Sequence, residues 1–257
     1  MAEMRVGGIP LHVQRLGPAE GRPVVFLHGL VMDNLSSWYF TVANPVAAHR
    51  PVLLYDLRGH GRSGRPDTGY TLDDLVAELR GVLDACEVQR ATLVGNSFGG
   101  LLALASALAH PDRVDGLVLV DALLPEPGWG ERMAGTLGLR GDERDARIAT
   151  SFEHWLGRHS ARKRTRLAEH ARALVEGTTL LADIRASRSW EDTAYEALAM
   201  PVLALYGADS DVRDQGERLA ARLSDVDLTI LPGCSHSVLW EATDRVREDV
   251  VAWLEAR

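Results

Sequence analysis

Short apolar runs of the kind found in buried strands alternate with helical patterns along most of this chain. Several runs are continuous Val and Leu, which is typical of strands covered on both faces of a parallel sheet. The alternation predicts β-α-β units and an α/β fold with a mostly parallel, doubly wound sheet, whose ligands bind beyond the carboxyl ends of the strands. The expected strands are 11–16, 24–27, 52–55, 92–94, 116–120, 202–206 and 228–231, and the clearest helices are 72–83, 213–223 and 244–254.

The alternation stops between Leu124 and Leu198. A Pro- and Gly-rich cluster at 125–130 opens this stretch, and charge-rich helical patterns follow it without an apolar strand pattern. We therefore expect a helical cap at 125–198, inserted between the core segments 1–124 and 199–257 and folded over the functional edge of the sheet.

Composition narrows the class of function. With 28 Lys and Arg against 36 Asp and Glu, the net charge of −8 argues against a nucleic-acid partner. Cys86 and Cys234 form neither a disulfide framework nor a plausible set of metal ligands. The first 25 residues lack the apolar core of a signal peptide, and no apolar stretch approaches membrane-spanning length. We expect a cytoplasmic protein with no metal and no cofactor.

Residues 95–99, Gly-Asn-Ser-Phe-Gly, lie between an expected strand and a helix-forming run. This context predicts a nucleophile elbow, a sharp turn that exposes the hydroxyl of Ser97 above the sheet. A turn this tight leaves no room for a Cβ at Gly95 or Gly99. The start of the following helix directs N–H groups and a positive dipole end toward negative charge near the hydroxyl.

Further candidates follow other expected strands. His28-Gly29-Leu30 comes after strand 24–27, where a glycine turn can present a backbone N–H to the same point as that of Phe98. His236 follows the last strand, and a neutral imidazole can take the serine proton near pH 7. The carboxylate that would orient the imidazole has three candidates after two earlier strands: Asp121, Asp209 and Asp211.

Taken in order, these motifs make the chain resemble an α/β-hydrolase. The motifs are His28-Gly29, 56–63 (Asp-Leu-Arg-Gly-His-Gly-Arg-Ser), 95–99, Tyr206-Gly207 and 232–236 (Pro-Gly-Cys-Ser-His). The resemblance implies Ser97 as nucleophile, His236 as base and then acid, and the N–H groups of Leu30 and Phe98 as oxyanion hole. It leaves the acid open. The commoner pattern places the acid three residues beyond Gly207, which here is Ser210.

A branch of the family similar to polyketide-type thioesterases, and also to some lipases, takes its acid one strand earlier, where this chain has Asp121. Asp121 is therefore the first candidate, with Asp209 and Asp211 as alternatives. Each of the three could equally be a turn or cap residue, because short carboxylates bond nearby backbone N–H groups. His28 and His60 are expected to be structural.

Aromatic and apolar residues near the expected site are candidates for the substrate pocket or for ordinary packing. The pocket candidates are Trp38, in the segment after the oxyanion residues, and the cap residues Trp129, Met133 and Trp155. The basic run 158–166 is typical of a solvated helix face. It is also compatible with docking of an acyl carrier protein or a coenzyme A thioester.

The resemblance implies a serine hydrolase that cleaves a carboxylic ester or thioester of a small, mostly apolar substrate through an acyl-enzyme. Two alternatives use the same triad. One is carbon–carbon bond hydrolysis, because 95–100 is similar to the corresponding segment of ring-cleavage-product hydrolases. The other is biosynthetic acyl transfer or cyclisation. A non-catalytic ligand receptor of this fold is the alternative from another class.

Overall fold

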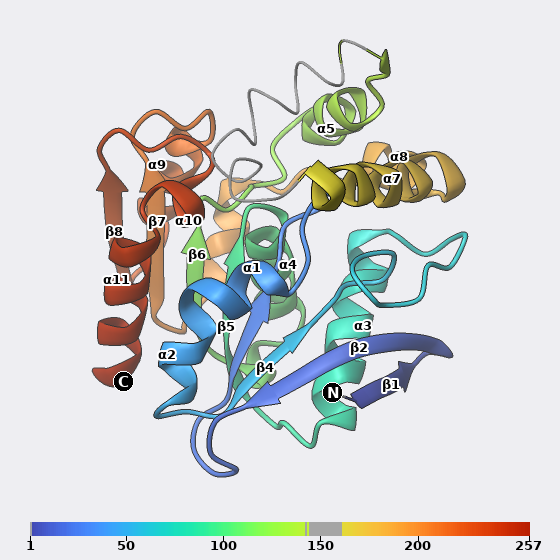
Figure 1. Cartoon of the computed structure of the whole chain (residues 1–257). Coiled ribbons are helices and arrows are strands. Elements are labelled where there is room, and N and C mark those ends of the chain that lie inside the picture. Colours follow the sequence, from blue (N-terminus) through green and yellow to red (C-terminus); the bar gives the residue numbers. More distant parts are fainter. Residues whose placement is uncertain (1, 142, 144–160) are drawn as a thin grey trace.

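An eight-stranded sheet forms the centre of the protein, with strand order β1-β2-β4-β3-β5-β6-β7-β8 (Figure 1). The structure is a computed structural model that describes residues 2–141, 143 and 161–257. The strands are β1 (Ala2–Val6), β2 (Ile9–Leu16), β3 (Val24–Leu27), β4 (Val52–Tyr55), β5 (Ala91–Asn96), β6 (Val114–Val120), β7 (Val202–Gly207) and β8 (Val226–Leu231).

From β4 through β8 all neighbouring strands are parallel, and β2 pairs antiparallel with both β1 and β4. The expectation of a mostly parallel α/β-hydrolase sheet is therefore confirmed. Strand β1 was not expected. It forms a hairpin with β2 around Gly7 and Gly8, whose φ values of 55° and 83° suit a tight turn.

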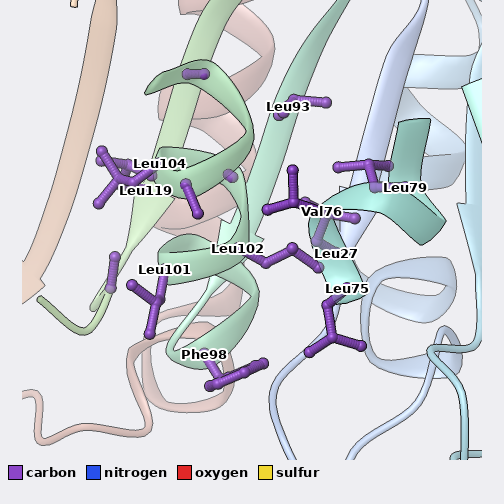
Figure 2. Close-up of a cluster of buried hydrophobic side chains, with 14 of the residues drawn as sticks. Leu27, Leu75, Val76, Leu79, Leu93, Phe98, Leu101, Leu102, Leu104 and Leu119 are labelled. Carbon is purple, nitrogen blue, oxygen red and sulfur yellow. The ribbon is translucent and has the colours of Figure 1, made fainter. Parts of the chain in front are cut away.

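Helices cover both faces of the sheet because strand side chains alternate between the faces. Leu27 and Leu93 belong to the cluster beneath α3 (Leu72–Ala85) and α4 (Phe98–Ala109), which Figure 2 shows. On the other face Phe26 packs on Trp38, with ring centroids 5.2 Å apart. That face is covered by α1 (Ser36–Trp38), the π-helical turn η1 (Tyr39–Ala43), α2 (Asn44–Ala47), α10 (Val238–Glu241) and α11 (Thr243–Glu255).

Thr71 is the N-cap of α3. Its hydroxyl accepts the N–H of Asp74 at 3.1 Å, and the Asp74 carboxylate accepts the N–H of Thr71 at 3.2 Å. This reciprocal capping box satisfies two backbone donors that the first helical turn leaves unpaired. The helix α9 (Arg213–Ala220) lies between β7 and β8, and η2 (Pro111–Arg113) is a short 3-10 turn before β6.

The described part of 125–198 contains helices and no strand. It forms α5 (Trp129–Leu137), α7 (Ala161–Gly177), α8 (Leu180–Arg185) and the 3-10 helix η3 (Asp192–Ala197). Helices α5, α7 and α8 lie over the carboxyl end of the sheet, above the elbow (Figure 1). That 125–198 forms a separate helical cap, with these limits, stays a prediction. No helix within the described ranges combines the length and apolarity needed to cross a bilayer.

Candidate active site

Ser97 occupies the turn between β5 and α4. Its backbone has φ 51° and ψ −118°, a conformation that non-glycine residues rarely adopt. Strained conformations of this kind are concentrated at functional sites, where the surrounding structure maintains them. A Cβ on Gly95 would lie 2.3 Å from the carbonyl oxygen of Gly99, and one on Gly99 would lie 2.2 Å from that of Leu27. Both glycines are therefore required sterically, which is the reason the sequence pattern suggests.

His236 lies between Ser97 and Asp121. Its Nε2 is 2.9 Å from Ser97 Oγ, and its Nδ1 is 2.6 Å from Oδ2 of Asp121. Because a carboxylate only accepts, Nδ1 carries the proton and donates it to Asp121, which leaves Nε2 free to accept from the serine hydroxyl. The imidazole thus has the tautomer that a general base for Ser97 needs.

Asp121 is the carboxylate that the structure brings to His236. It follows β6, is 1% exposed and also has a positive φ, of 48°. Its Oδ1 accepts the N–H of Gly207 at 2.8 Å, and its Oδ2 accepts the hydroxyl of Ser210 at 2.5 Å. These bonds, together with the one from His236, satisfy a buried carboxylate that would otherwise be costly to ionise.

The two alternative acids are placed differently. The side chains of Asp209 and Asp211, both in the described range, make no hydrogen bond with His236, and they line the cavity in front of it instead. The N–H of Asp209 donates to the carbonyl of Cys234 at 2.9 Å, which ties the two loops together. Ser210, between these aspartates, is a member of the site that the sequence did not reveal as a hydrogen-bond donor to the acid.

Electrostatics favour a charged imidazole at this position. Burial opposes the charged form of His236, but the hydrogen bond and charge of Asp121, with smaller contributions from Asp211 and Glu241, outweigh it. The net effect raises the pKa of His236 above its usual value. An imidazolium formed during a reaction is therefore stabilised where it forms.

Two residues beside Ser97 have backbone N–H groups without a described acceptor. Leu30 and Phe98 both line the cavity that contains Ser97 and His236. Within the described part of the chain, neither N–H has a hydrogen-bond partner. For Phe98 the reason is its place in the first turn of α4, where N–H groups lack an intrahelical acceptor. The pair is thus available to bind an oxyanion.

A cavity of about 940 Å³ opens from Ser97 toward α5 and α7. Its walls are mostly apolar, and its charged residues comprise more carboxylates than arginines. The apolar lining comes from the oxyanion segment, the chain after β6, α5, α7 and the loop after β7, and includes Met32, Leu123, Leu137, Ala171, Val175 and Val212. The charged members are Glu126, Glu131, Arg132, Arg172, Glu176, Asp209 and Asp211.

Of the residues that the sequence suggested for the substrate pocket, some line the cavity and one does not. Trp129 and Met133 of α5 line the cavity. Trp38 does not, so this expectation is wrong: it is fully buried against Phe26, and its Nε1 donates to the carbonyl of Leu27 at 2.9 Å. Trp155 lies outside the described residues, as do 158–160 of the basic run.

Sequence reasoning missed the contribution of α7. Ala168, Ala171, Arg172 and Val175 of this helix line the cavity. Their spacing of three and four residues places them on one face of a helix, so the signal was present. It was obscured because small and charged residues at these positions do not stand out as an apolar stripe.

Comparison with known proteins supports the fold assignment. The family profile described as alpha/beta hydrolase fold matches residues 22–196. The chain is 32% identical over 244 residues to a protein of Variovorax paradoxus strain S110 assigned as carbamate hydrolase RutD, covering 90% of this chain and 91% of the relative. It is 42% identical over 120 residues to the 2-hydroxy-6-oxo-2,4-heptadienoate hydrolase of Pseudomonas putida F1, covering 46% of this chain and 42% of the relative.

The same architecture occurs in the crystal structure of the enol-lactonase from Burkholderia xenovorans LB400. The two structures superpose with a TM-score of 0.78 at 24% identity, over 99% of this chain and 100% of that one. At this identity the likeness concerns the fold alone. The family profile extends from just before β3, across the elbow, to η3, and the RutD relative aligns over nearly the whole chain. The chain is therefore a member of the alpha/beta-hydrolase family.

Proposed function

We propose that this protein is a serine hydrolase that cleaves a carboxylic ester or thioester through an acyl-enzyme on Ser97. The observation that carries the proposal is the continuous chain from Ser97 Oγ through His236 to Asp121, with links of 2.9 Å and 2.6 Å. It stands beside two N–H groups that have no partner among the described residues. This arrangement supplies nucleophile, base, orienting acid and oxyanion donors for acyl transfer.

In the first half-reaction His236 Nε2 takes the hydroxyl proton as Ser97 Oγ attacks the carbonyl carbon. Negative charge moves to the carbonyl oxygen, where the N–H groups of Leu30 and Phe98 bind it. Asp121 keeps its charge and stabilises the imidazolium. As the tetrahedral intermediate collapses, His236 returns the proton to the departing alcohol or thiol, and the acyl group stays on Ser97.

In the second half-reaction a water molecule takes the place of the departed group. His236 removes a proton from this water as its oxygen attacks the acyl carbon, and the same N–H groups hold the second oxyanion. Collapse breaks the bond to Ser97, and the histidine returns the proton to the serine oxygen. The carboxylic acid is released and the enzyme is restored.

The cavity supports a small, mostly apolar substrate. Its apolar walls converge on Ser97, while its carboxylates disfavour an anionic group in the pocket. For the basic run 158–166 we propose docking of a carrier protein or a coenzyme A thioester. Of this run only Thr165 and Arg166 have described side chains.

Carbon–carbon bond hydrolysis is the second candidate, favoured by the 42% identity over 120 residues to a 2-hydroxy-6-oxo-2,4-heptadienoate hydrolase. The relative assigned as a carbamate hydrolase points to a third carbonyl substrate class that the same triad can attack. Comparing kcat/KM for a nitrophenyl ester, an aryl carbamate and a ring-cleavage diketone separates these classes. Our proposal requires the ester or a corresponding thioester to be preferred.

The test of the proposal is hydrolysis of 4-nitrophenyl esters of increasing acyl length by the wild type and by Ser97→Ala. We expect turnover by the wild type and a loss of roughly 10⁴-fold or more in kcat for the variant. Ser106→Ala is the matched control, because this buried hydroxyl of α4 has no partner among the described residues. Tight ligand binding without any turnover would instead identify a non-catalytic receptor.

A further inference from the structure

Two buried histidines behind the oxyanion segment have no part in the reaction described above. His28 directly precedes Gly29 and Leu30, and His60 lies in the loop between β4 and α3. They are 0% and 4% exposed, and their ring centroids are 5.1 Å apart. Neither lines the cavity that contains Ser97.

Each histidine bonds the backbone of the other's segment. Nε2 of His28 accepts the N–H of Leu57 at 3.0 Å, and Nε2 of His60 accepts the N–H of Val31 at 2.7 Å. The remaining ring nitrogens bond locally. Nδ1 of His28 lies 2.7 Å from the carbonyl oxygen of Gly29, and Nδ1 of His60 lies 2.8 Å from that of Arg58.

These partners define the protonation of both rings. A nitrogen facing a carbonyl must donate, and one facing an N–H must accept, so both rings are neutral with the proton on Nδ1. For His60, burial and then the neighbouring His28 lower the pKa to about 3. The acceptor for Val31 therefore persists throughout the neutral range.

The bond from His28 determines where the Leu30 N–H points. Its Nδ1 holds the carbonyl of the Gly29–Leu30 peptide, and because that peptide is trans, the N–H at its other end points the opposite way. This N–H is the oxyanion donor. The N–H of Gly29 is held separately by Oδ2 of Asp33 at 2.8 Å, so the preceding peptide is also fixed.

The bond from His60 secures the next peptide. The N–H of Val31 reaches His60, while the carbonyl of Leu30 accepts the N–H of Met32 at 2.8 Å. Between these bonds Val31 has a φ of 66°, which is unfavourable for a β-branched residue. Without the acceptor on His60, this strained turn would relax toward an ordinary φ and carry the Leu30 peptides with it.

We propose that His28 and His60 are positioning residues that together orient the Leu30 N–H toward the oxyanion. The assignment of that N–H as an oxyanion donor rests on the proposed function. The orientation of the peptide is inferred from hydrogen bonds alone and does not depend on the proposed function. Between them, the rings hold one peptide on each side of Leu30.

Side-chain amides allow each ring nitrogen to be tested alone. Asparagine places its amide where Nδ1 lies, and glutamine reaches the position of Nε2. His28→Asn therefore keeps the donor to Gly29, whereas His28→Gln keeps only the acceptor for Leu57. At the other ring the roles exchange, because His60→Gln keeps the acceptor for Val31 and His60→Asn keeps only the donor to Arg58.

The proposal predicts a crossed pattern in kcat. We expect His28→Gln and His60→Asn to lose about 10²- to 10³-fold with little change in KM, as for the loss of one oxyanion donor. His28→Asn and His60→Gln should stay within about tenfold of the wild type. Melting temperatures measured in parallel serve as the control, because a purely structural role predicts rate losses that follow stability and show no such crossing.

Crystal structures of the four variants provide a readout that does not depend on catalysis. The Gly29–Leu30 peptide should turn away from Ser97 in His28→Gln and His60→Asn and keep its orientation in the other two. An unchanged peptide in all four variants would overturn the proposal. If the wild type hydrolyses no ester, the proposed function fails, and these structures still decide whether the histidines orient the peptide.

Discussion

The hydroxyl of Ser210 lies 2.5 Å from Oδ2 of Asp121, the same oxygen that faces His236 Nδ1 at 2.6 Å. Ser210 stands three residues beyond Gly207, where the commoner family pattern places the acid. The two possible origins of the acid, after β6 and after β7, therefore converge on one point beside the imidazole. In this chain the strand β6 supplies the carboxylate and the β7 loop supplies a hydrogen bond to it.

Asp121→Asn should reduce kcat on the nitrophenyl ester by about 10⁴-fold while leaving the protein folded. The reason is the tautomer: an asparagine amide that bonds Nδ1 as a donor forces the proton onto Nε2, which then cannot accept from Ser97. Steady-state kinetics with circular dichroism as the folding control checks this. Near-normal activity would show that another group orients His236.

Adding Ser210→Asp to Asp121→Asn should restore at least about tenfold of the lost rate. The new carboxylate at position 210 would replace a hydroxyl that already lies within hydrogen-bond distance of Asp121 Oδ2, the oxygen that faces His236. The asparagine at position 121 could still accept the N–H of Gly207. Kinetics of the single and double variants measures the rescue. An additive or greater loss would mean that the β7 loop cannot present an acid to His236.

A plot of kcat/KM against pH should fall on its acid side with an apparent pKa above that of an ordinary histidine, which is about 6.5. The reason is that the pKa of His236 is raised. Only the neutral imidazole can accept the serine proton, so activity falls as pH drops through this pKa. Asp211→Asn removes one of the charges that raise the pKa and should move the limb to lower pH. Asp214→Asn, whose charge is not among these, serves as control and should leave the limb unchanged.

Gly99→Ala should abolish activity or prevent folding, because its Cβ would meet the carbonyl oxygens of Leu27 and His28 at 2.2 and 2.7 Å. Both oxygens belong to backbone that cannot move without displacing β3 or the oxyanion segment. Gly177→Ala is the control, since among the described residues no heavy atom beyond its chain neighbours and its own helix backbone lies within 4 Å of the added carbon. Soluble yield, melting temperature and ester turnover together measure the difference.

Trp38→Phe and Met133→Ala should separate stability from substrate recognition. Removing the indole N–H leaves the buried carbonyl of Leu27 without this bond, so we expect a loss of about 1–3 kcal/mol in stability and an unchanged KM. Met133 lines the cavity and is half-buried, so its truncation should lower kcat/KM about tenfold with little change in stability. A raised KM with unchanged stability in Trp38→Phe would instead show that Trp38 contacts the substrate.

Much of the fold could be predicted because its signals are local. The strands β3 and β4 are continuous apolar runs whose bounds agree with the sequence pattern, and Ser97 stands between a strand and a helix. The hairpin strand β1 was missed although its residues alternate between apolar and charged and Gly7-Gly8 is a turn signal, because so short a pattern is weak evidence for a strand by itself. The need for glycine at positions 95 and 99 could also be predicted, since most of the clashes that a Cβ would make there arise close to the elbow.

What the sequence left open depends on contacts between distant segments. Asp121, Asp209 and Asp211 all follow neighbouring parallel strands, so each is brought to the same sheet edge, and only the loop geometry selects Asp121. Trp38 was misplaced because an aromatic residue after the oxyanion segment can turn either to the cavity or to the sheet. The helical phase of α1 turns it onto Phe26.

The most direct test of the central claim is covalent labelling by a fluorophosphonate, which phosphonylates an activated serine and expels fluoride. We expect one adduct per protein by intact mass, located by peptide mapping on Ser97, with no adduct in Ser97→Ala and full labelling of Ser106→Ala. Labelling at any other residue, or none on folded wild-type protein, would contradict the account.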